Sequence, residues 1–112
     1  MLTQNESMRD LQNMLLRQFK KLHDSLDDVT DAARAQTIVR EMQEVNHRIA
    51  LAGSLLFAAQ AKELDGKVAE VSKAIRKVNA AIADLKNLHA FLDVMSEFLG
   101  LVDEAIDLAK AL

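Results

Sequence analysis

The chain has 112 residues, half of them apolar, and its formal net charge is −3. It contains no cysteine and no proline, three glycines, and phenylalanine as its one type of aromatic residue. The lack of cysteine excludes disulfides, thiolate metal sites and thiol nucleophiles, and the acidic balance gives no reason to expect a nucleic acid as partner. The length suits one domain, residues 1–112, around one core, and the excess of Ala, Leu, Val, Ile and Met is typical of helices.

The first predicted helix covers residues 6–28. Apolar residues recur from Leu15 to Leu26 in steps of three and four, a spacing that places them on one face of a helix. Just beyond this helix the apolar residues no longer follow steps of three and four. Thr30 and Asp31, which lie there, are good N-cap residues. We therefore expect a turn there and a second helix after it.

The second predicted helix covers residues 31–64. Its apolar seam begins at Ile38 and reaches Ala59 in the same steps, and Gly66 is expected to cap its end, since glycine tolerates the left-handed backbone found there. Residues 49–61 are almost entirely apolar. This segment is too short to span a membrane, which takes about twenty apolar residues. Because it continues the seam, we expect it in a core or an interface.

The rest of the sequence predicts two helical segments, residues 67–87 and 88–111. The spacing of the apolar residues shifts register near Asn87, where there is no proline or glycine, so the two segments form either one continuous helix or two separate helices. The first carries one narrow seam, typical of a coiled-coil arm. The second carries two adjacent apolar stripes, a face too wide for one partner helix. We expect an all-α fold, in which an antiparallel hairpin or coiled coil of the second and third helices is thickened into a three- or four-helix bundle.

The last predicted helix carries the candidate binding surface. Its second apolar stripe exceeds what three or four helices are expected to cover, and surplus apolar surface suits self-association or a protein partner. The acidic row beside it is either a solvated face or a docking edge for basic side chains, approached closely at a glycine. The candidate partner-binding residues are Phe91, Val94, Phe98, Leu101, Leu108, Asp93, Glu97, Gly100, Glu104 and Asp107.

No catalytic, metal-binding or cofactor constellation is predicted. Glu44 and His47 have the Glu-x-x-His spacing of di-iron bundles, but they lie off the seam and no second such pair exists, so we expect exposed polar residues. His23 and Asp27 are expected as an exposed helical pair, and His89 is either exposed or a polar residue that fixes helix pairing. The chain has no Gly-x-Ser-x-Gly and no glycine-rich phosphate loop. We expect no enzymatic activity, no cofactor and no small-molecule substrate.

Two functions stay open from the sequence. The first is a non-enzymatic helical interaction module, such as a subunit, adaptor, chaperone or immunity-type inhibitor, that binds a protein partner or further copies of itself through the last helix. The alternative is a membrane-active helical protein that exposes residues 49–61 or 91–112 to lipid. We expect a cytoplasmic location, because the first ten residues lack the basic start and apolar run of a secretory signal.

Overall fold

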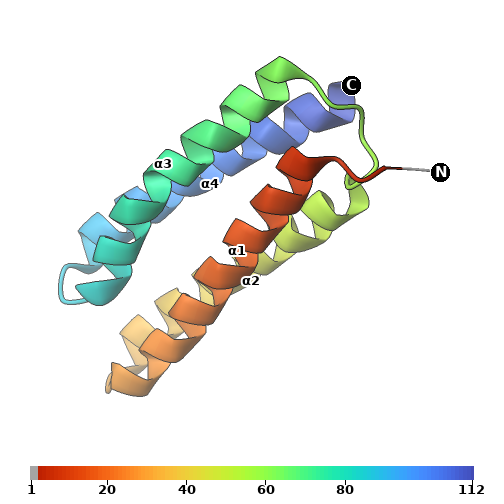
Figure 1. Cartoon of the computed structure of the whole chain (residues 1–112). Coiled ribbons are helices and arrows are strands. Elements are labelled where there is room, and N and C mark those ends of the chain that lie inside the picture. Colours follow the sequence, from red (N-terminus) through yellow and green to blue (C-terminus); the bar gives the residue numbers. More distant parts are fainter. Residues whose placement is uncertain (1–2) are drawn as a thin grey trace.

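The computed structural model describes residues 3–112, and within that range the chain forms an all-α bundle of four helices (Figure 1). They are α1 (Glu6–Ser25), α2 (Ala32–Ser54), α3 (Lys62–Ala83) and α4 (Leu88–Ala111). A single 3-10 turn, Leu26–Asp28, follows α1. The bundle is elongated, 49 Å long and 21 by 17 Å across. The expected fold class is therefore confirmed.

The helices pair as two antiparallel hairpins, α1 with α2 and α3 with α4. The hairpins lie side by side, so that α1 also packs along α3 and α2 packs, more loosely, along α4. The expected hairpin of the second and third helices is wrong, because α2 and α3 lie diagonally across the bundle. Short turns join the two helices of each hairpin, and such neighbours in sequence usually become neighbours in space.

The boundary between α2 and α3 differs from the prediction. The helix α2 ends at Ser54, the chain crosses the end of the bundle, and α3 begins at Lys62 and continues through Gly66. Gly66 thus caps nothing, and no glycine in residues 3–112 has a positive φ. The start of α1, the end of α4 and this crossing segment lie at the same end of the molecule (Figure 1).

Asn5 holds the crossing segment in place through hydrogen bonds. Its side chain is fully buried, and its Oδ1 accepts a hydrogen bond of 3.1 Å from the Met8 N–H, which caps α1. Its Nδ2 donates to the carbonyl oxygens of Ala58, at 3.2 Å, and Ala59, at 3.1 Å. Buried carbonyl groups need such partners. The first turn of α1 therefore holds the segment that leaves α2.

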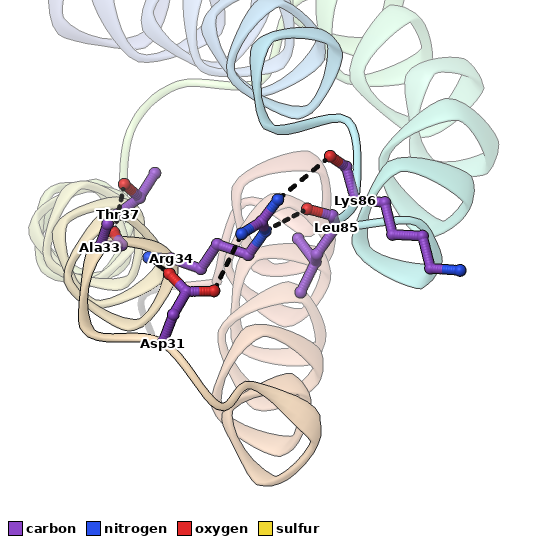
Figure 2. A network of polar contacts seen from close by, with 6 residues as sticks. All are labelled: Asp31, Ala33, Arg34, Thr37, Leu85 and Lys86. Atoms are coloured by element: carbon purple, nitrogen blue, oxygen red, sulfur yellow. Dashed lines mark hydrogen bonds and ion pairs between the residues drawn. The ribbon is translucent and has the colours of Figure 1, made fainter.

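At the opposite end, Arg34 connects the two hairpins (Figure 2). Its Nη1 donates to Oδ2 of Asp31 at 2.9 Å, while Nε donates to the Leu85 carbonyl at 3.1 Å and Nη2 to the Lys86 carbonyl at 3.4 Å. Asp31 also caps α2 by accepting a 2.8 Å hydrogen bond from the Arg34 N–H, as its position in the sequence predicts. One guanidinium group therefore joins the start of α2 to the loop between α3 and α4.

The slip near Asn87 is a turn between two helices. The helix α3 ends at Ala83, and Asn87 caps α4 by accepting a 3.1 Å hydrogen bond from the Ala90 N–H. The core runs the length of the bundle and draws on every helix. Its fully buried large side chains include Met8, Leu11, Leu15, Leu22, Ile38, Leu64, Phe91, Met95, Phe98 and Ile106.

Candidate protein-binding groove between α2 and α4

The structure separates the predicted binding residues into an apolar set and an acidic set. In the apolar set, Phe91 is 1% and Phe98 0% exposed, and both belong to the core of the chain itself. Val94, Leu101 and Leu108 are half-buried and pack against that core. This corrects the expectation for the two phenylalanines, because α4 packs against both α3 and α2, and together these helices cover a wide apolar face.

The acidic set forms an exposed edge along α4. Asp93, Glu97, Gly100, Glu104 and Asp107 are all exposed. Asp93 lies 3.4 Å from Nε2 of His89, and Glu104 lies 3.4 Å from the ammonium group of Lys67. Exposed ion pairs of this kind contribute little to stability. The acidic edge therefore stays accessible, and its role in binding stays a prediction.

A groove of about 460 Å³ runs between α2 and α4, where the bundle packs most loosely. Gly100 belongs to both the groove and the acidic edge, so the two surfaces are continuous. Local sequence patterns do not reveal this groove, because they carry no information on the pairing of α2 with α4. Its lining residues are Arg40, Glu41, Glu44, Arg48, Ser96, Leu99, Gly100 and Asp103.

One wall of the groove is a closed network of charges. Arg48 donates from Nε to Oδ1 of Asp103 at 2.7 Å and from Nη2 to Oδ2 at 2.9 Å. Its Nη1 donates to the Glu44 carboxylate at 2.9 Å. Burial acts to lower the pKa of Arg48, but the hydrogen bonds with Asp103 and Glu44 outweigh it and raise that pKa. The Arg48 guanidinium group is thus already paired with two carboxylates of the chain itself.

Glu41 lines the same groove but forms no hydrogen bond with that network. The residue as a whole is only 9% exposed, but its carboxylate oxygens are not among the polar atoms that the fold shields completely from solvent. Within residues 3–112 the carboxyl group makes no hydrogen bond or ion pair. Burial, followed by the charge of Glu44, raises the pKa of this carboxyl group, while Arg48 and Arg40 act in the opposite direction. Removing a carboxylate partly from water without a hydrogen bond costs stability. The sequence does hold a signal for this burial, because Glu41 lies three residues after Ile38 and four before Val45, on the apolar seam.

The fold of the chain itself does not require a glycine at position 100. A Cβ atom at this position would meet nothing within 4 Å, and its backbone is helical. A glycine inside a helix costs about 1 kcal/mol relative to alanine. At Gly53, by contrast, a Cβ atom would come 2.7 Å from the side-chain nitrogen of Gln12. Gly66 has open surroundings like those of Gly100 but does not line the groove.

The other sequence-derived candidates are distributed over the surface or the core. His47 and Glu44 are exposed, as are His23 and His89. Among the described residues, no three or more acidic or histidine side chains are grouped so that they could hold a metal ion. In the same part of the chain, no helix has the length and apolar character needed to cross a membrane.

Residues 49–61 take several different environments. Ala52 is buried, and Leu55 and Leu56 pack against the core from the turn after α2. Phe57, at 58% exposure, is the largest apolar side chain of the segment that faces solvent. Most of its large apolar side chains thus pack against the core, in line with the apolar seam, but Phe57 and the seam residue Ala59 are exposed.

Comparisons of the chain with protein-family models, with curated proteins and with solved structures found no match.

Proposed function

We propose that this protein is a non-enzymatic helical interaction module that binds a protein partner at the α2/α4 groove and along the acidic edge of α4. The observation that supports this most is the presence of Glu41 and Gly100 in the same groove. Each costs stability, because the Glu41 carboxyl group is partly removed from water without a hydrogen bond and because Gly100 lies in a helix where an added side chain would meet open space. Natural proteins keep such violations of local rules mainly at functional sites.

The surface has the mixed character of a protein-binding site. Leu92, which is 39% exposed and lies one helical turn before the groove residue Ser96, supplies apolar contact area beside the charged groups of the groove. Leu99 lines the groove but is only 7% exposed. Charge complementarity across such a surface governs partner choice and association rate more than affinity. The bound protein is either a different chain or a second copy of this one.

A photo-cross-linking experiment tests the proposal. A benzophenone amino acid replaces Ser96, an exposed residue of the groove, in one variant and Ser72, an exposed residue of α3 outside the groove, in a matched control. We expect position 96, and not position 72, to give one discrete adduct, whose protein is identified by mass spectrometry. Light scattering on the purified chain over a dilution series then separates self-association from binding of another protein. Equal labelling from both positions, or none from position 96, contradicts the proposal.

A further inference from the structure

We propose that Glu41 is the receptor for one arginine side chain of the partner, presented by a helix whose backbone lies against Gly100. This inference deepens the proposed function and rests on it. It names the chemistry that the groove recognises: a guanidinium group bound by a carboxylate that the chain itself leaves unpaired.

The first argument is the state of the Glu41 carboxylate. The residue is nine-tenths buried and lines the groove, its carboxylate oxygens still reach solvent, and it has no hydrogen-bond or ion-pair partner within residues 3–112. A charge that is partly removed from water is stabilised when an opposite charge or several hydrogen bonds compensate it. A cationic side chain entering the groove would supply both, and the planar guanidinium group can donate two parallel hydrogen bonds to one carboxylate.

The second argument is that neither cation of the groove forms a hydrogen bond or ion pair with Glu41, although the charges of Arg48 and Arg40 favour its ionised form. Arg48 is bound to Asp103 and Glu44 by the hydrogen bonds described above. Arg40 lines the groove but precedes Glu41 directly in the helix, and consecutive helical residues point in different directions. Arg40 forms no ion pair with the described part of the chain. The carboxylate therefore stays available to a cation from outside.

The third argument is the charge of the whole surface. The groove is lined by three carboxylates, Glu41, Glu44 and Asp103, and by two guanidinium groups, Arg40 and Arg48. The exposed acids of α4 extend this excess of negative charge beyond the groove. Such a surface attracts a basic segment and repels an acidic one.

Gly100 supplies the room that this arrangement requires. It lies on α4 opposite the α2 wall of the groove, and the space above its Cα is open. The absence of a side chain there lets a second helix backbone come close. An arginine on that helix then reaches into the groove with its long aliphatic stem beside Leu99.

The test uses the full chain and a defined probe, a capped alanine-rich helical peptide with arginines spaced four residues apart. Two further peptides carry citrulline, which is neutral and has the same shape, or lysine in place of arginine. In amide NMR titrations we expect the arginine peptide to shift signals of the α2/α4 groove and to bind at least about tenfold more tightly than the citrulline peptide. We expect the lysine peptide to bind between them.

Glu41→Gln is the decisive variant, and Glu63→Gln, an exposed acid at the start of α3, is its control with the same change in net charge. We expect Glu41→Gln to weaken binding of the arginine peptide about tenfold and Glu63→Gln to change it less than twofold. In the unchanged chain, the arginine peptide should also lower the pKa of Glu41, followed by NMR of its side-chain carbon, because an adjacent cation favours the carboxylate.

Three results would overturn the inference: equal binding of the arginine and citrulline peptides, equal effects of the two glutamine variants, or an unchanged Glu41 pKa. If one of these occurs while position 96 still cross-links a partner, the proposed function stands and the role of Glu41 is wrong. If position 96 gives no adduct either, both proposals are wrong.

Discussion

Arg48 of α2 and Asp103 of α4 form a two-pronged ion pair, with hydrogen bonds of 2.7 and 2.9 Å, across the most loosely packed seam of the bundle. The Arg48 side chain is 13% exposed, so this pair is shielded from water more than the other surface pairs. It fixes the spacing of the two helices that form the candidate groove.

Replacing the guanidinium group tests the importance of that pair. We expect Arg48→Lys to lower the free energy of unfolding by about 1 kcal/mol, because an ammonium group cannot form both parallel hydrogen bonds. Urea denaturation measures the change. As a control, Lys20→Gln removes an exposed pair with Asp24 and should leave the midpoint unchanged. Equal midpoints for Arg48→Lys and the unchanged chain would contradict the structural role.

Asn5 should contribute strongly to stability although it precedes the first helix. We expect Asn5→Ala to lower the free energy of unfolding by about 2 kcal/mol, because it removes the cap of α1 and the donors to Ala58 and Ala59. Asn5→Asp keeps the cap oxygen but loses both donors, so it should also destabilise. Thermal unfolding of these variants is compared with that of Asn46→Ala, at an exposed position of α2. A similar change at both positions would contradict the prediction.

Gly100 and Gly66 form a matched pair for separating stability from binding. Alanine at either position should raise the free energy of unfolding by about 1 kcal/mol, because no atom lies within 4 Å of the added Cβ. Leucine at position 100 should also block the arginine peptide, whereas leucine at position 66 should not. Denaturant titration and NMR binding assays measure the two effects. Loss of binding from position 66 as well would show that the groove is not the site.

Glu41 should make stability depend on pH in a defined direction. Its folded-state pKa is raised, first by burial, so its contribution is fully present below the ordinary glutamate pKa of about 4.3 and is lost as pH rises through the raised value. At neutral pH, Glu41→Gln should therefore stabilise the chain and raise its Tm. The gain should vanish below pH 4. A destabilised Glu41→Gln chain at pH 7 would contradict this assignment.

The Arg34 contact should hold the two hairpin ends together. In Arg34→Ala, we expect the amides of residues 84–90 to exchange with solvent about tenfold faster, because the carbonyls of Leu85 and Lys86 lose a charged donor. Amides near Asn5 should not change. Arg17→Ala, at an exposed position of α1, serves as control. Unchanged exchange at residues 84–90 in Arg34→Ala would show that the contact contributes nothing.

Asp31 gives the opposite pH dependence from Glu41. The Arg34 backbone N–H and then its side chain hold the Asp31 pKa below its ordinary value, so the stabilisation is present above that value and is lost as pH falls through the lowered one. Asp31→Asn retains a cap but cannot titrate. We expect its unfolding midpoint to vary less with pH than that of the unchanged chain between pH 5 and 2, as followed by circular dichroism. Identical pH profiles would contradict the prediction.

Local patterns in the sequence were sufficient for the helical class and for most helix positions. On the seam that starts at Ile38, Val45 and Ala52 are also buried, whereas Met42 and Ile49 are half-buried and pack against the core. Asp31 caps α2 as expected. Both signals depend on residues within a few positions of each other, because a helix repeats every 3.6 residues and a cap acts within one turn. For the same reason the start of α4 near residue 88 could be predicted, although the presence of a turn could not.

The pairing of the helices and the composition of the site depended on the tertiary structure. The end of α2 is set by Asn5, which lies 53 residues from Ala58 in the chain, and no local pattern carries that information. Phe91 and Phe98 are covered because α4 meets two helices at once. Glu41 is enclosed only because α2 packs beside α4. The sequence by itself determined which faces are apolar; which faces meet was decided by hydrogen bonds and packing between distant residues, since many pairings can bury similar apolar area.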